Sequence, residues 1–220
     1  MRYIQDMVFL IESLLTGRVQ RFADGDSSAI AKTAVDGPRN VFWLGIEGDA
    51  QADLSVHGGP DKAIHHYPRD HYEDWREALG PMALLDQAGA FGENISTSGL
   101  TEDIACIGDR YRLGTAIVEI AQGRQPCWKQ AHRLNNASVV AAMVRTRRCG
   151  WYYRVINEGV VAAGDALTLL DRPHPEWTIA RVIGLLIAGE GKKDRAAVRA
   201  LAHLDVLAEN WRRRAAKLAG

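Results

Sequence analysis

The chain has 220 residues, of which 47% are apolar and 25% charged, and its 27 basic side chains balance 27 acidic ones. A chain of this length builds a full core without disulfides, and its three cysteines form no C-x-x-C pair, which argues against a secreted disulfide framework or a zinc ribbon. Zero net charge removes the usual electrostatic argument for binding nucleic acid or an anionic membrane. The first apolar stretch, Met7 to Leu15, contains Glu12 and lacks a cleavage signal, so we expect a cytoplasmic protein without a membrane span.

Short apolar runs separated by glycine fill the chain up to about Arg172 and predict a mostly β domain. Several of them alternate with the period of two that a half-buried strand requires. Many short strands with interspersed helices favour a barrel. The expected strands are Gly17 to Ala23, Ala29 to Val35, Asn40 to Leu44, Arg110 to Leu113, Thr115 to Ala121 and Ala166 to Leu170.

Two helices are expected within this β-rich part of the chain. The first begins at Pro68 and ends before Gly80, where a further proline follows. The second is capped by Ser138 and ends near Cys149, just before a glycine. Both are isolated between strands, so they do not change the mostly β fold class.

The apolar spacing changes to a period of 3.6 after Pro173, which predicts three further helices. We therefore expect an N-terminal extension over residues 1–12, a β-barrel domain over residues 13–173 and a small C-terminal three-helix module over residues 174–220. The apolar face of the module must be buried, and the barrel is the nearest surface. Its basic end suits either packing or the docking of an acidic partner, and carries Arg212, Arg213, Arg214 and Lys217.

A histidine-rich run, His57 to Pro68, is the densest polar cluster of the sequence. Its Gly-Gly-Pro turn lets backbone N–H groups approach a ligand closely, and Lys62 adds a charge suited to a phosphate. A tight turn with solvated side chains explains the composition equally well. A histidine metal site is a weaker alternative, because His65 and His66 are adjacent and would face opposite sides of a strand.

The segment from Phe91 to Thr97 offers hydrogen-bonding groups that suit the edge of a heterocycle. Glu93 supplies an acceptor, and the amide of Asn94 both donates and accepts. The alternative is a surface turn in which Asn94 bonds its own backbone, as asparagine commonly does in loops.

Cys127 lies where an expected strand gives way to a loop. Residues 119–154 around it carry seven basic side chains and one acidic one, whereas residues 1–118 carry 10 basic and 18 acidic side chains. Cations beside a cysteine favour its thiolate, which serves as a nucleophile or as a soft-metal ligand. Isolated cysteines are more often buried packing residues, and Cys106 and Cys149 fit that role.

Together these segments resemble the MOSC domain family, and within it the YiiM-like group. The resemblance covers residues 13–172, and the helical tail is similar to the three-helix module that follows the barrel in that group. It implies a MOSC-type β-barrel that binds the molybdenum cofactor, a pterin dithiolene with a terminal phosphate, through Cys127 as the protein ligand to molybdenum. The segments that carry the resemblance are Gly45 to Asp49, His57 to Pro68, Phe91 to Asn94 and Arg124 to Lys129.

The remaining contacts to such a cofactor are expected from the other segments. Lys62, Arg124 and Lys129 would supply positive charge for the phosphate. His57, His66 and Asn94 would bind the polar edges of the pterin.

The resemblance also implies an activity, the reduction of N-hydroxylated compounds such as N-hydroxylaminopurines, with electrons from a flavin-containing reductase. A second possibility within the family is a sulfur carrier that uses a Cys127 persulfide, and a third is a module that binds the cofactor without turnover. Residue type alone allows a cysteine hydrolase with His57 or His132 as the base. Molybdenum content distinguishes the reductase from the sulfur carrier.

Overall fold

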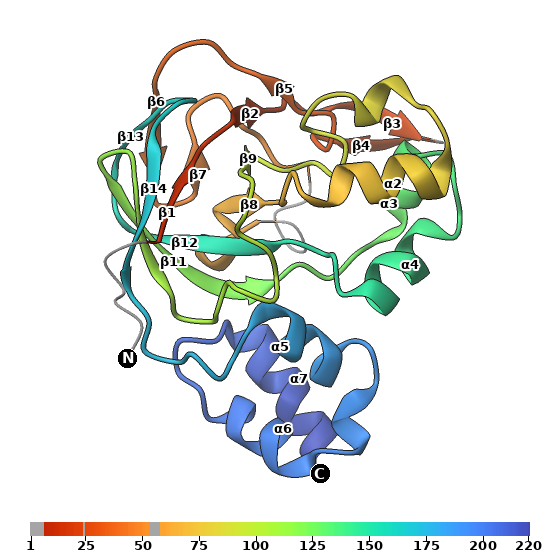
Figure 1. Cartoon of the computed structure of the whole chain (residues 1–220), viewed down its shortest axis with the longest axis vertical. Helices are drawn as coiled ribbons and strands as arrows, with labels where there is room; N and C mark the ends of the chain where they lie inside the picture. The colour runs from red at the N-terminus through yellow and green to blue at the C-terminus, as the bar shows by residue number, and fades with distance from the viewer. Residues whose placement is uncertain (1–6, 24, 53–57) are drawn as a thin grey trace.

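A computed structural model describes residues 7–23, 25–52 and 58–220 (Figure 1). Its main element is a nine-stranded sheet that curls into a half-barrel. Adjacent strands are antiparallel, except that β8 and β9 pair in parallel, so the sheet is mixed. The order across the sheet is β1 (Val8–Leu10), β14 (Ala166–Asp171), β10 (Arg110–Leu113), β11 (Ala116–Gly123), β12 (Trp151–Asn157), β8 (Ile64–His66), β9 (Ile95–Ser96), β2 (Ser13–Thr16) and β5 (Thr33–Ala34).

Two smaller sheets and three helices complete the β-rich part. The smaller sheets are β13 (Gly159–Val161), β6 (Arg39–Phe42) and β7 (Gly45–Ile46), and the hairpin of β3 (Gln20–Ala23) and β4 (Asp26–Ser28). The α-helices are α2 (His71–Leu79), α3 (Trp128–Arg133) and α4 (Val139–Thr146), and the short 3₁₀ turns are η2 (Pro60–Lys62) and η3 (Ala83–Leu85). Helices α2 and α4 lie within the predicted segments, although α2 begins at His71 and not at Pro68. The Ser138 hydroxyl donates to Asn136 Oδ1 at 2.7 Å and does not cap α4 as predicted.

Helices α5 (Ile179–Leu186), α6 (Arg195–Ala202) and α7 (Glu209–Ala219), with the 3₁₀ turn η4 (Glu190–Lys192), gather at one end of the molecule (Figure 1). Their apolar side chains belong to the same hydrophobic cluster as those of the sheet, so the core continues from one part into the other. A separate module after residue 173 stays a prediction. Across the described residues, none of the helices combines the length and the apolarity needed to cross a membrane.

The N-terminal strand differs from the expectation of an extension over residues 1–12. Val8–Leu10 forms β1 and pairs with β14, with Phe9 opposite Leu167. Ile11 is completely buried in the core. Part of the expected extension therefore lies in the sheet.

Strands β8, β9 and β12 were not expected, although they position the site described below. β9 and β8 have only two and three residues, all buried, so neither shows an alternation of buried and exposed positions. β12 does alternate between buried and half-buried residues. Because β12 lies between β11 and β8, it brings the loop after β11 next to the histidine-rich run.

Candidate functional site

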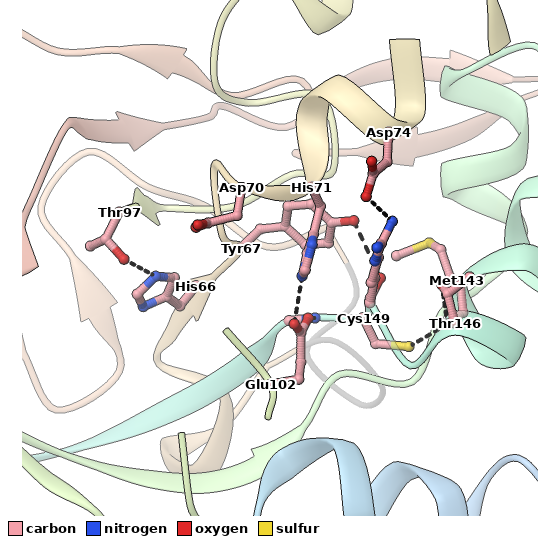
Figure 2. Close-up of polar contacts among 12 residues, drawn as sticks. His66, Tyr67, Asp70, His71, Asp74, Thr97, Glu102, Met143, Thr146 and Cys149 are labelled. Carbon is pink, nitrogen blue, oxygen red and sulfur yellow. Dashed lines mark hydrogen bonds and ion pairs between the residues drawn. The ribbon is translucent and has the colours of Figure 1, made fainter. Parts of the chain in front are cut away.

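Two adjacent histidines of β8 face different surroundings, as their position on a strand predicts. His65 lines a cavity, whereas the His66 ring lies within the core. One ring nitrogen of His66 lies 3.0 Å from the Tyr153 hydroxyl and the other 3.0 Å from the Thr97 hydroxyl. Figure 2 shows the contact with Thr97. His66 is therefore held by protein partners, and burial lowers its pKa to about 3.

The cavity that His65 lines, which we call the cation cavity, has a volume of about 70 Å³. Five of the seven predicted site residues line it, and they come from η2, the turn before β9, the loop after β11 and α3. Sheet pairing thus gathers segments that lie far apart in the sequence. These five residues are Lys62, Asn94, Arg124, Cys127 and Lys129.

The other two predicted residues are not brought to this cavity by the described structure. His66 packs in the core, and His65, its neighbour, lines the cavity instead. His57 lies outside the described residues.

Buried polar atoms without partners mark the cation cavity. Neither ring nitrogen of His65 and neither Nε nor Nη1 of Arg124 finds a hydrogen-bond partner in the described part of the chain. The two side chains are only 3% and 6% exposed, so water does not readily satisfy them. Burial, together with the charge of Arg124, lowers the pKa of His65 well below its usual value. A neutral imidazole beside an unsatisfied guanidinium is therefore available to a ligand.

Asn94 and a buried ion pair build one wall of the cavity. The Asn94 side chain accepts a hydrogen bond from His65 N at 3.0 Å and donates one to Asp49 Oδ2 at 2.9 Å. Asp49 also pairs with Lys32, and burial lowers the pKa of that lysine although the carboxylate opposes the shift. The Asn94 amide thus fastens β8 to the loop that carries Asp49. Its contact with a heterocycle stays a prediction.

Glu93, expected as a possible ligand acceptor, is completely buried and fastens its own loop. Its carboxylate accepts hydrogen bonds from Gly89 N at 2.6 Å and Phe91 N at 3.1 Å, and from the Tyr72 hydroxyl. The Glu93 carboxylate therefore stabilises its own turn, and the structure gives it no role as an acceptor for a ligand.

Cys127 is half-buried and lies at the start of α3. Its backbone N–H donates to Gln130 Oε1 at 2.9 Å, and its carbonyl accepts from Gln130 N at 3.1 Å. On the other side of the loop, Arg124 N donates to Gly150 O at 2.9 Å. Both ends of the loop are therefore anchored, which holds the thiol in place at the cavity wall.

The basic segment contributes less charge to the cavity than its composition suggests. Of its seven basic side chains, only Arg124 and Lys129 line the cation cavity, and Lys62 joins them from η2. Three of the others form ion pairs away from the cavity. Composition could not show this, because it does not say where a side chain points. The ion pairs are Arg147 with Glu190, Arg148 with Asp74, and Arg154 with both Asp61 and Glu119.

The other two cysteines are buried, as expected for packing residues. Burial raises the pKa of Cys106 to about 12 and raises that of Cys149 as well. Within the described chain, no three or more His, Cys, Asp or Glu side chains gather in a way that could hold a metal ion. Cys127, by contrast, lies among cations at a cavity wall.

Sequence reasoning missed His65 and selected His66. Two adjacent histidines on a strand face opposite sides of the sheet, but which of them faces the cavity depends on the pairing of β8 with β12. Tyr152, opposite His65 in that pairing, also lines the cavity and was missed because β12 was not expected.

Comparisons with known proteins show which proteins this chain resembles. A family model described as the MOSC domain matches residues 53–168. Protein YiiM of Escherichia coli (strain K12) is 45% identical over 157 residues, which cover 71% of this chain and 70% of that protein. The crystal structure of YiiM from Geobacillus stearothermophilus has a TM-score of 0.81 at 33% identity, covering 96% of this chain and 100% of that one.

A longer relative bears the name "Reductase" and comes from Gibberella moniliformis (strain M3125 / FGSC 7600). It is 39% identical over 169 residues, which are 76% of this chain. The match spans only 30% of that protein, so most of its length has no counterpart here.

Proposed function

Because the chain belongs to the MOSC domain family, we propose that its cation cavity binds the molybdenum cofactor and that the protein reduces N-hydroxylated compounds. The observation that carries this proposal is the set of buried, unsatisfied polar atoms on His65 and Arg124 beside Cys127. A buried donor without a partner costs about 1–3 kcal/mol. An anionic, polar ligand would remove that cost.

The lining residues match the chemistry of such a cofactor. Arg124, Lys62 and Lys129 offer charge-assisted hydrogen bonds to a phosphate. The neutral ring of His65 suits a polar edge of the pterin, which gives it the role that the sequence assigned to His66. The thiolate of Cys127 is a soft ligand of the kind that molybdenum accepts. The cavity therefore fits the group in charge and in donor type.

The proposed reaction breaks one N–O bond, takes up two electrons and two protons, and releases the reduced amine and water. The bound molybdenum centre supplies the two-electron redox chemistry, and a flavin-containing reductase supplies the electrons.

Metal and pterin analysis tests the proposal directly. The protein is purified from a host that synthesises the molybdenum cofactor, and turnover of 6-N-hydroxylaminopurine is measured with a chemical reductant. We expect about one molybdenum and one pterin per chain, with turnover. A metal-free protein with cyanide-labile sulfur would identify a sulfur carrier instead, and bound cofactor without turnover would identify a storage module.

A further inference from the structure

A second cavity of about 260 Å³ also includes Cys127 in its wall. We call it the amide cavity, because amide and aromatic side chains dominate its lining. Cys127, Lys62 and Tyr152 line both cavities, so ligands bound in the two cavities would meet beside the thiol. The other residues that line the amide cavity are Gln122, Gln125, Pro126, Asn210 and Trp211.

Gln122 enters this wall at a β-bulge in β11. In the pairing with β12, Ile120 lies opposite Tyr153. Gln122 lies opposite the next residue, Tyr152, which leaves Ala121 as an extra residue. Gln122 is only 2% exposed, and its Oε1 accepts no hydrogen bond from the described part of the protein. Bulges redirect side chains next to active sites, and a buried open acceptor points to a donor on a ligand.

The same bulge fixes the helix that forms the opposite wall. The carbonyl of Ala121 accepts a hydrogen bond at 2.9 Å from the N–H of Ala208, the residue that caps α7. A Cβ atom at Gly123 would lie 3.0 Å from the Trp211 ring, so a glycine here lets α7 pack closely on β11. The first turn of α7 thereby supplies Asn210 and Trp211 to the cavity.

The lining favours a flat nitrogen heterocycle. Tyr152 and Trp211 offer aromatic rings for packing against a flat ligand, and side-chain amides pair with the mixed donor and acceptor edges of bases. The open acceptor of Gln122 favours a ligand nitrogen that carries a hydrogen.

We propose that the amide cavity binds the ring of the N-hydroxylated substrate and that Gln122 determines its specificity. The N–H of the hydroxylamino group donates to Gln122 Oε1, and the amine of the reduced product does the same. The N–O bond then faces the part of the wall that both cavities share. This inference rests on the proposed function, because it places the substrate next to the cofactor cavity.

Calorimetric titration with adenine and with purine, which lacks the exocyclic amine, tests the role of Gln122 without measuring turnover. The protein is purified from a host that makes the cofactor. We expect adenine to bind about tenfold more tightly than purine, because it makes one additional buried hydrogen bond. Gln122→Met should bind the two bases equally. Gln87→Met, at an exposed site before β9, should keep the tenfold preference.

A preference for adenine that survives Gln122→Met would overturn the inference. If that variant does not fold, Asn210→Ala decides, because Asn210 is exposed on α7 and its substitution should leave the fold intact. Asn210→Ala should weaken the binding of both bases about fivefold, and unchanged binding would overturn the inference.

Molybdenum content of the same samples separates this inference from the proposed function. A lost preference at unchanged molybdenum content supports both. A protein without molybdenum that still prefers adenine supports the base-binding cavity and contradicts the proposed reductase.

Discussion

Two buried polar regions of this protein differ in how their hydrogen bonds are satisfied. In the first region, part of which Figure 2 shows, His66 is bonded through both ring nitrogens and Glu102 through both carboxylate oxygens. Beside Cys127, His65 and Arg124 are almost equally buried, yet several of their nitrogens find no partner in the described chain. Adjacent residues of one strand thus belong to opposite kinds of environment.

We interpret the difference as one between polar groups that stabilise the fold and polar groups that, under the proposed function, bind a ligand. An unsatisfied buried group lowers the free energy of unfolding by about 1–3 kcal/mol, so a protein retains it only where something else compensates. The region of Figure 2 should stabilise the fold, whereas the unsatisfied groups beside Cys127 should lower its stability until the proposed ligand binds. Substitutions in the two regions should therefore have opposite effects on folding and on binding.

Cys127→Ser should have the largest effect on function and little effect on stability. The hydroxyl is a poor substitute for a thiolate ligand, so we expect turnover to fall by more than about a hundredfold, beyond the loss typical of residues that only support a ligand. Turnover and molybdenum content measure this change. Cys106→Ser and Cys149→Ser are the controls and should keep both. Full turnover and full molybdenum in Cys127→Ser would remove this residue from the metal site.

Glu102→Leu should have the largest effect on stability. Glu102 lies 2.6 Å from His71 Nε2 and accepts from Gly150 N at 2.7 Å, so its loss leaves two buried groups without a partner. We expect the free energy of unfolding to fall by about 3 kcal/mol. Chemical denaturation measures it, with Glu77→Leu on the exposed face of α2 as the matched control. Equal stability of the two variants would contradict the structural role of this region.

The fold follows from the sequence where local signals are strong. Strand β10 lies where alternation predicts it, and helix α4 lies between Ser138 and Gly150 as predicted, although the Ser138 side chain does not cap it. Strands β8 and β9 could not be found, because strands of two or three buried residues carry no period and exist only through pairing. Strand β1 was predicted as part of a terminal extension for the same reason, because only its pairing with β14 makes it a strand.

The side chains that line the cation cavity were easier to select from the sequence than the strands that hold them. Arg124 and Cys127 directly follow Gly123 and Pro126, and Lys62 and Lys129 lie two residues after Pro60 and Cys127. His65 could not be distinguished from His66, because the choice depends on the pleat of β8. The wall of the amide cavity that α7 forms could not be predicted either, since α7 follows β11 by more than 80 residues and no local pattern links the two elements.

Arg124→Met should weaken cofactor binding without lowering the stability of the cofactor-free protein. The change removes a guanidinium whose Nε and Nη1 have no partner in the described chain, so the cofactor-free protein should be as stable as the original or more stable. Loss of a charge-assisted hydrogen bond costs about 1.5–3 kcal/mol of binding, so retained pterin should fall ten- to a hundredfold. Pterin fluorescence after purification measures this. Undiminished pterin would remove Arg124 from the site.

Acid should destabilise the protein through its buried histidines. The pKa of His65 is lowered well below 6.5 and that of His66 to about 3, so below pH 6.5 the unfolded chain binds protons that the folded chain does not. Stability is therefore present above pH 6.5 and is lost as the pH falls, by about 1.4 kcal/mol per pH unit for each histidine. Denaturation of the original protein and of His65→Gln between pH 7.5 and 5.5 measures the share of His65. Parallel profiles would show that His65 is not a neutral buried group.

The outer face of α7 poses the same question at the surface, namely whether a charge is satisfied within the chain or by a partner. Arg214 is held by Leu186 O at 2.7 Å and Gln125 Oε1 at 3.2 Å. Arg213 is 69% exposed and lies 3.7 Å from Glu209, a pair that contributes little, and Lys217 is exposed. These two cations are therefore the ones to test as a docking surface for an acidic flavin reductase.

Charge reversal tests this surface better than removal of the helices, because α5 and α7 share the core with the sheet. Arg213→Glu with Lys217→Glu should slow reduction by the physiological reductase about three- to tenfold at low salt, since surface charges mainly set association rates. The difference should shrink as salt screens the charges. Turnover with dithionite should not change, and Arg18→Glu, an exposed residue before β3, serves as the control. An equal loss with both electron donors would show that α7 acts through the cavity beside Cys127 and not as a docking surface.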